Sequence, residues 1–161
     1  MPRSEKNQLI AAFQSVLDSG QILLGPEVQI FESQLSSYCN RNFAVSVGSG
    51  TDALHIAYLL AGLKKNDEVI CPVFTCTATN IPLLYIDAKI KFADVNLHDL
   101  NIDINHVEKL ITKKTKAIVF VNYGGLLCDL DRLNKLAKKH KLILIQDAAQ
   151  SLGAKYKNKD I

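Results

Sequence analysis

The chain has 161 residues, of which 48% are apolar and 22% are charged, and its formal net charge is +3. This length corresponds to one domain or a piece of one, and the apolar content excludes an intrinsically disordered chain. The small positive charge argues against phosphate-driven binding of nucleic acid.

Two helices are predicted at the start of the chain. Apolar residues recur at helical spacing through residues 4–18, and the pattern stops at Gly20. Pro26 suits the first turn of a second helix, whose apolar face runs to Cys39. We therefore expect residues 1–40 to form amino-terminal helices.

The pattern then changes to short apolar runs that alternate with helical stretches. Runs of strand length lie at residues 43–47, 68–73, 89–93, 117–121 and 142–145. Helical patterns lie near residues 51–62, 78–86, 105–112 and 129–139. Continuously apolar strands are typical of a parallel sheet that is covered on both faces. Residues 41–161 therefore predict a doubly wound, mostly parallel α/β layer with helices on both faces.

The last residues, 155–161, resemble the first arm of a hairpin around a polar turn, with no second arm. A sheet that ended there would keep an unfilled edge and an uncovered face. We therefore expect the amino-terminal part of a longer protein, with a layer that is incomplete at the carboxyl end. An isolated chain of this kind should be poorly soluble.

The four cysteines are Cys39, Cys71, Cys76 and Cys128, and they form no Cys-x-x-Cys pair. No histidine lies at zinc-ligand spacing from them, so we expect no metal site. Ordinary buried thiols favour a reduced, cytoplasmic protein. The start of the chain is unlike a signal peptide, and no apolar run approaches the roughly 20 residues that span a bilayer. We therefore expect no membrane association.

Functional residues are expected after the strands, because ligands of open α/β sheets bind at the carboxyl ends of the strands. Residues 48–52 follow the first predicted strand and open a helix, where free amides and the Thr51 hydroxyl suit a phosphate. A plain helix cap by Ser49 or Thr51 is an equally good interpretation.

The same segment matches a dinucleotide fingerprint, Gly48-x-Gly50-x-x-Ala53. That fingerprint needs an acid at the end of the second strand to bind a ribose. No acid occurs there, which argues against NAD.

Asp147 directly follows the last predicted strand, where a carboxylate needs a cation or amide N–H groups. It is interpreted either as the cap of a short helix, with Gln150 completing a capping box, or as a carboxylate that holds a protonated ring nitrogen. The two are compatible. Asp129 is interpreted as a helix cap, whereas Asn122 and Tyr123 are interpreted as ligand contacts or turn residues.

Six segments together resemble the DegT/StrS family of sugar aminotransferases, and their order and spacing extend the resemblance over residues 21–159. They are Leu24-Gly25-Pro26-Glu27-Val28, Gly48-Ser49-Gly50-Thr51-Asp52-Ala53-Leu54, Asp67-Glu68-Val69-Ile70, Leu100-Asn101-Ile102-Asp103, Thr112-Lys113-Lys114-Thr115-Lys116-Ala117-Ile118 and Asp147-Ala148-Ala149-Gln150. The resemblance implies a pyridoxal 5'-phosphate (PLP) enzyme with the large domain of the aspartate-aminotransferase (type I) fold. It further implies a homodimer that acts on nucleotide-linked keto sugars.

The resemblance also implies roles for site residues. Gly50 and Thr51 match the phosphate-binding turn of the family. Asp147 matches the acid that keeps the pyridine nitrogen protonated, and Gln150 matches the residue near the ring hydroxyl. Cys76 falls where the family has an aromatic residue that stacks on the ring.

Two departures from the family pattern matter. The Cys76 sulfur offers no π-face, so stacking on the ring should be weaker or move to Phe74. The Schiff-base lysine of the family lies beyond Ile161, so we expect no catalytic residue in this chain. The lysines at positions 155, 157 and 159 come too early to replace it.

We therefore expect a chain that is inactive alone. Its parent would transfer an amino group, with glutamate as the expected donor, to a nucleotide-linked keto sugar in polysaccharide or amino-sugar biosynthesis. Two alternatives stay open. One is a dehydratase of the same family, in which a histidine replaces the lysine, and the other is a non-catalytic domain that binds a phosphate ligand.

Overall fold

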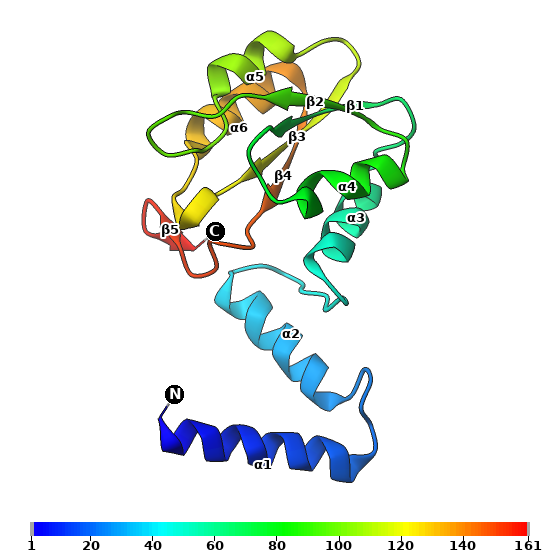
Figure 1. Ribbon diagram of the computed structural model, residues 1–161, viewed down its shortest axis with the longest axis vertical. Coiled ribbons are helices and arrows are strands. Elements are labelled where there is room, and N and C mark those ends of the chain that lie inside the picture. The colour runs from blue at the N-terminus through cyan, green and yellow to red at the C-terminus, as the bar shows by residue number, and fades with distance from the viewer. Residues whose placement is uncertain (1, 161) are drawn as a thin grey trace. The chain divides into compact units, whose positions relative to one another are not determined.

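The computed structural model of the chain describes residues 2–160, with side chains described for residues 2–158 (Figure 1). The chain divides into two compact units, Met1–Ser46 and Val47–Ile161. Each unit is built from different elements, and all the predicted site residues lie in the second.

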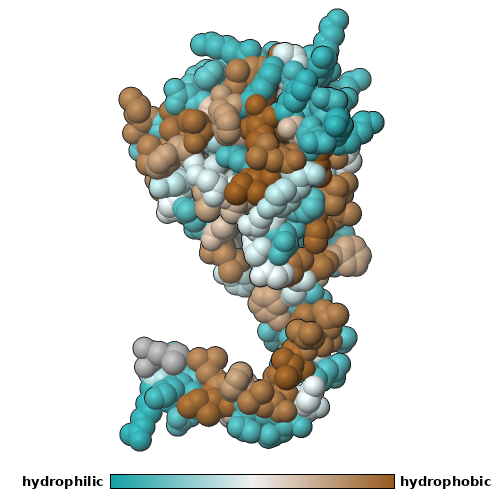
Figure 2. Space-filling model, turned by 45° about the vertical axis from the view of Figure 1, so that its right-hand side comes forward, coloured by the Kyte–Doolittle hydropathy of each residue, from teal (hydrophilic) through white to brown (hydrophobic). Residues whose placement is uncertain are grey.

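The first unit contains the two predicted helices, α1 (Arg3–Ser19) and α2 (Pro26–Tyr38). Helix α1 ends because Gly20 adopts a left-handed conformation (φ 68°), which is the usual way in which glycine stops a helix. Neither helix contains a buried residue. Apolar side chains accordingly lie on the surface along both helices, as the brown atoms in Figure 2 show.

The strand predicted at residues 43–47 is wrong. Within the described residues, this segment joins no sheet. The side chains of Phe43 and Val45 are 85% and 77% exposed. An apolar, β-branched pattern favours a strand, but a strand also needs a neighbour with which to form hydrogen bonds. The sequence pattern carries no information on whether that neighbour is present.

The second unit is built on a parallel sheet of four strands in the order β2-β1-β3-β4. The strands are β1 (Glu68–Pro72), β2 (Lys89–Ala93), β3 (Thr115–Val121) and β4 (Ile143–Asp147). Four predicted strands are thus confirmed, with small shifts at their ends. Because Val121 pairs with Asp147, the ladder of β4 runs further than predicted, and Asp147 is the last residue of the strand.

Four helices cover the two faces of the sheet (Figure 1). They are α3 (Gly50–Leu60), α4 (Thr77–Tyr85), α5 (Ile104–Leu110) and α6 (Leu130–His140). Val69 and Cys71 of β1 belong to the core under α3 and α4, whereas Ile70 belongs to the core under α5 and α6. This alternation confirms the predicted doubly wound α/β layer, with helices on both faces.

The order of the strands creates a switch point between β1 and β3. The chain moves from β1 to β2 on one side, and then crosses to place β3 on the other side of β1. In open α/β sheets, ligands bind at the carboxyl ends of the strands beside such a switch. The start of α4 and the short 3-10 helix η1 (Tyr123–Gly125) lie at these ends.

The expectation of a hairpin with no second arm is wrong. Strands β5 (Lys155–Tyr156) and β6 (Lys159–Asp160) pair with each other in antiparallel fashion. The two residues between them, Lys157 and Asn158, both have positive φ (51° and 63°). This is the geometry of a type I′ turn, which two-residue hairpin loops favour.

Candidate functional site

Asp147 ends β4 with its half-buried carboxylate held by two donors. Its Oδ2 accepts the hydroxyl of Thr79 at 2.7 Å, and its Oδ1 accepts the amide of Ala149 at 3.1 Å. The capping-box interpretation is wrong, because the residues after β4 form turns rather than a helix. The amide of Ala149 bonds two residues back to the carboxylate, as in an Asx-turn.

Gln150 instead fastens the loop after β4 to the loop after β3. Its Oε1 accepts the amide of Gly124 at 2.6 Å. Gly124 and Gly125 both have positive φ (61° and 82°), which favours glycine. A Cβ added at Gly125 would lie 3.2 Å from the Gln150 carbonyl oxygen, so the two loops are also in close backbone contact.

Two buried carboxamides hold the loops around η1. Asn122, which is 0% exposed, donates to Ser151 Oγ at 3.1 Å and accepts the amide of Cys128 at 3.1 Å. Asn101 accepts the amide of Tyr123 at 3.0 Å and donates to the carbonyl of Leu126 at 3.1 Å. Of the two interpretations of Asn122, ligand contact or turn residue, these hydrogen bonds and its burial favour the turn residue.

An aromatic pair bridges the switch point. Phe74 follows β1 and Tyr123 follows β3. The centroids of their rings lie 4.7 Å apart, at an interplanar angle of 46°. Phe74 is 44% exposed. Cys76 lies two residues further on as the cap residue of α4, with its thiol free and exposed and without a capping hydrogen bond. The structure therefore offers a partly exposed aromatic ring close to the predicted Cys76 position.

The amino terminus of α3 is capped and still open to a ligand. Ser49 Oγ accepts the amide of Asp52 at 3.1 Å and donates to the Asp52 carboxylate at 2.8 Å. The amides of Gly50 and Thr51 have no acceptor among the described residues, as is usual in a first helical turn. Apart from its chain neighbours and the backbone of its own helix, no atom lies within 4 Å of a Cβ added at Gly50.

Sequence reasoning missed Thr79, the residue that contacts Asp147. Its side chain is 0% exposed on α4, and its hydroxyl oxygen lies 2.8 Å from that of Thr75. The buried Tyr58 hydroxyl of α3 donates to the Thr79 carbonyl at 2.7 Å. Burial is the main cause that raises the pKa of Tyr58. The four-residue spacing of Thr75 and Thr79, at the start of a predicted helix, was the available signal.

The five predicted site residues lie on three parts of the second unit: the end of β4 with the turn after it, the start of α4, and the start of α3. Asp147 and Gln150 share the turn after β4, and Asp147 reaches α4, which begins beside Cys76. Gly50 and Thr51 begin α3, which packs against α4 and contacts β4. Within the described residues, neither of them forms a hydrogen bond with the other three predicted residues.

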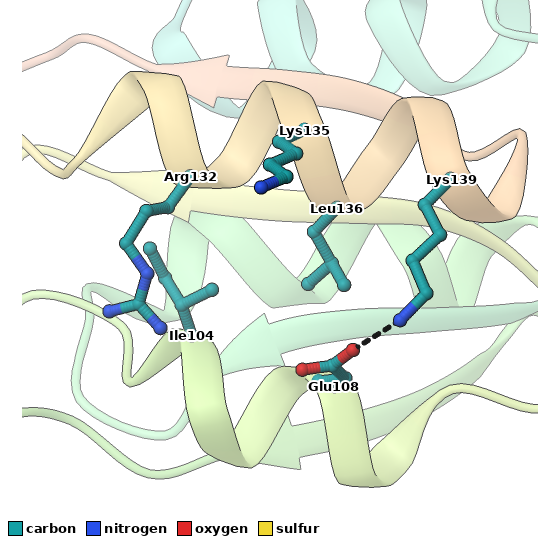
Figure 3. Close-up of a pocket in the computed structure, with 6 residues that line it drawn as sticks. All are labelled: Ile104, Glu108, Arg132, Lys135, Leu136 and Lys139. Atoms are coloured by element: carbon teal, nitrogen blue, oxygen red, sulfur yellow. Dashed lines mark hydrogen bonds and ion pairs between the residues drawn. The ribbon is translucent and has the colours of Figure 1, made fainter.

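A cavity of about 320 Å³ lies elsewhere, between α5 and α6 (Figure 3). Its charged lining residues are Glu108 on α5 and Arg132, Lys135 and Lys139 on α6. Lys139 forms an ion pair with Glu108 at 2.8 Å, which lowers the pKa of that carboxyl. These are solvated surface charges, and the cavity has no part in the predicted site.

The described part of the chain shows neither a metal-ligand cluster nor a membrane-spanning helix. No group of three or more His, Cys, Asp or Glu side chains within residues 2–158 could hold a metal ion. None of the described helices combines the length and the apolar character needed to cross a membrane.

Known proteins match this chain over nearly its full length. The sequence profile of the DegT/DnrJ/EryC1/StrS aminotransferase family matches residues 3–161. The UDP-2-acetamido-2-deoxy-3-oxo-D-glucuronate aminotransferase of Pseudomonas aeruginosa is 40% identical over 154 residues. That match covers 96% of this chain and 43% of the relative. The chain therefore spans about two fifths of the length of the curated relatives.

Solved structures match as closely. The structure of Streptomyces venezuelae DesV, in complex with a ketimine intermediate, has a TM-score of 0.94 and 38% identity and covers 97% of this chain. The E. coli GDP-4-keto-6-deoxy-D-mannose-3-dehydratase with bound hydrated PLP has a TM-score of 0.87 and 34% identity and covers 93%. This chain covers 42% and 40% of these two structures.

Proposed function

Because the chain belongs to the DegT/DnrJ/EryC1/StrS aminotransferase family and has the type I fold of PLP enzymes, we propose that it forms the cofactor-binding part of a nucleotide-sugar aminotransferase. The whole protein would move an amino group to a nucleotide-linked keto sugar. The relatives that carry a sugar-aminotransferase name support this substrate class. The donor that we propose is glutamate.

The observation that carries the proposal is the set of hydrogen bonds that the Asp147 carboxylate accepts. Each of its oxygens accepts one hydrogen bond from the protein. An ionised carboxylate has about four lone-pair sites, so it can accept further donors. A protonated pyridine nitrogen is a donor that such a carboxylate would hold by charge as well as by hydrogen bonding. This set of donors and acceptors fits PLP.

The start of α3 fits the phosphate of the same cofactor. The Gly50 and Thr51 amides are open, and the positive end of the helix dipole favours a dianion there. The Thr51 hydroxyl adds a further donor. We propose that Gln150 lies near the ring hydroxyl, and that Cys76 or Phe74 contacts the ring face.

The bound cofactor would supply an electron sink for the carbon that loses or gains the amino group. The residues of this chain would do the binding and orienting. Asp147 would hold a proton on the ring nitrogen, and the start of α3 would anchor the phosphate. We propose that the Schiff-base lysine belongs to the part of the family sequence that this chain does not cover.

A dehydratase of the same family is the second candidate. The 34% identity and TM-score of 0.87 with the E. coli dehydratase favour keeping it. By the resemblance, the two activities differ at a position of the family, lysine or histidine, that this chain does not cover. We place the aminotransferase first because the curated sugar relatives carry that activity in their names.

We also propose the setting in which the whole protein works. It would act in amino-sugar or polysaccharide biosynthesis, as a homodimer in the cytoplasm. The four free cysteines, two of them buried, support a reducing compartment.

Binding of pyridoxamine 5'-phosphate (PMP) tests the proposal. This amine form of the cofactor forms no Schiff base with surface lysines, so its affinity reports the site alone. We expect Asp147→Asn to weaken PMP binding at least about tenfold, because a neutral amide loses the charge-assisted bond to the ring. Asp131→Asn, at an exposed acid of α6, is the matched control. Equal affinity of Asp147→Asn and the unsubstituted chain, measured by titration calorimetry, would contradict the proposal.

A further inference from the structure

Two threonine hydroxyls connect the start of α4 to the Asp147 carboxylate, and a tyrosine hydroxyl of α3 holds the backbone of one of these threonines. Thr75 and Thr79 lie with their hydroxyl oxygens 2.8 Å apart, and Thr79 Oγ1 lies 2.7 Å from Asp147 Oδ2. Tyr58 donates its hydroxyl proton to the backbone carbonyl of Thr79 at 2.7 Å. These contacts join residues that lie up to 68 positions apart in the sequence.

The direction of these hydrogen bonds follows from counting protons. A threonine hydroxyl has one proton, and an ionised carboxylate can only accept. The Thr79 proton therefore points to Asp147, so Thr75 must donate to the Thr79 oxygen. The Thr75 proton thus points to the Thr79 oxygen, and the Thr79 proton points to the carboxylate.

The position of Thr79 is constrained on both its side chain and its backbone. Its side chain is completely buried, and the Tyr58 contact fixes its backbone from the side of α3. Within residues 2–158, no lysine, arginine or histidine forms an ion pair with Asp147. Among the described residues, the printed partners of this carboxylate are the hydroxyl of Thr79 and the amide of Ala149, so lone pairs remain for a ligand.

We propose that Thr79 is a positioning residue. Its hydroxyl, ordered by Thr75, fixes the rotation of the Asp147 carboxylate so that the remaining lone pairs face the cofactor's ring nitrogen. This inference rests on the proposed function. Thr79 itself does not touch the cofactor, and it acts through Asp147.

The test compares two ligands that differ at one ring atom. One is PMP, and the other is its carbocyclic analogue, in which a C–H group replaces the ring nitrogen. The ratio of the two dissociation constants isolates the contact between Asp147 and the ring nitrogen. A general loss of packing would weaken both ligands alike and leave this ratio unchanged.

We expect Thr79→Val, which keeps the shape and removes the hydroxyl, to lower this preference for PMP about tenfold. Thr79→Ser should restore the preference to within about threefold, because it keeps the donor. Thr77→Val is the matched control, since Thr77 is exposed on the same helix. It should leave the ratio unchanged. Thr75→Val, at a less buried position, should give a smaller selective loss even if Thr79→Val does not fold.

The possible failures are distinguishable. If the unsubstituted chain binds both ligands equally, the proposed function is contradicted at Asp147, and this inference falls with it. If the unsubstituted chain prefers PMP and both threonine-to-valine variants at positions 75 and 79 keep that preference, only the role of Thr79 is overturned. Equal weakening of both ligands by Thr79→Val also overturns it.

Discussion

The cysteine thiols occupy contrasting environments. Cys71 and Cys128 are buried in the cores on opposite faces of the sheet. Burial raises the pKa of both thiols, that of Cys128 to about 12. Cys76 is exposed at the start of α4, and Cys39 is half-buried. Because the thiolate is the reactive form, access and pKa together predict a clear order of reactivity.

Iodoacetamide at pH 8 should alkylate Cys76 in the folded chain and leave Cys71 and Cys128 unmodified. Peptide mass spectrometry over a time course measures this directly, with urea-unfolded chain as the control in which all four thiols react. If Cys76 lies at the cofactor ring, PMP should slow its alkylation several-fold. Full reactivity of Cys76 in saturating PMP would contradict its place in the proposed site.

Cys128 also predicts a dependence of stability on pH. In the unfolded chain the thiol ionises near pH 9, whereas in the folded chain its pKa is about 12. The folded state therefore keeps a proton that the unfolded state releases. The contribution of Cys128 to the free energy of unfolding should be constant below pH 8. It should fall as pH rises from about 9 toward 12, by up to about 1.4 kcal/mol per pH unit.

Urea unfolding at several pH values between 7 and 10.5 measures this slope. Cys128→Ala removes the titrating group, so its curve should fall less steeply than that of the unsubstituted chain. Cys71 and Tyr58 remain in both chains, and their raised pKa values affect both curves equally. Parallel curves for the two chains would show that Cys128 does not contribute to the pH dependence of the free energy of unfolding.

At the scale of single elements, α6 has favourable groups at both ends. Asp129 accepts the amide of Arg132 at 3.0 Å, which confirms the predicted cap. Lys138, Lys139 and His140 occupy the last turn, where positive charge suits the helix dipole. The helix covers the core on its face of the sheet through Leu133 and Leu136.

Asp129→Ala should therefore lower the free energy of unfolding by about 1 kcal/mol, because one amide of the first turn loses its acceptor. Asp129→Asn keeps a side-chain oxygen at the cap and should cost much less. Chemical denaturation of the three chains side by side measures the difference. A loss of the same size in the asparagine variant would mean that charge, rather than capping, is responsible.

At the scale of the whole molecule, large apolar side chains remain in contact with water. Phe43 and Val45 are mostly exposed, and further apolar side chains lie along α1 and α2. Exposed apolar groups of this extent favour association. We expect the chain to self-associate as its concentration rises. The double variant Phe43→Lys, Val45→Lys should reduce this association.

Sedimentation velocity over a concentration series tests this expectation. A control with two lysines at Lys113 and Lys116 replaced by glutamine changes charge on another surface and should not reduce association. An unsubstituted chain that stays monomeric throughout the series would contradict the prediction of poor solubility made from the sequence.

The amino-acid pattern predicted the helices, four strands and the layered class because these depend on local periodicity. Residues 43–47 show the limit of that information, since their pattern favours a strand but says nothing about a pairing partner. The resemblance to the family, which the sequence match over residues 3–161 confirms, supplied the proposed roles of Asp147 and Gln150. Neither source predicted the contact of Thr79 with Asp147, because it joins α4 to the end of β4 across 68 positions of the sequence.

The buried carboxamides of Asn101 and Asn122 have a consequence for motion. Each one bonds backbone or side-chain groups of a different loop, so the three loops at the strand ends are cross-braced. Displacing one loop would leave buried polar groups without hydrogen-bond partners, which costs free energy. Little loop entropy then remains to be lost when a small molecule docks on this edge. Slow hydrogen exchange of the Tyr123 and Cys128 backbone amides, in the absence of any ligand, would show that these loops are ordered before binding.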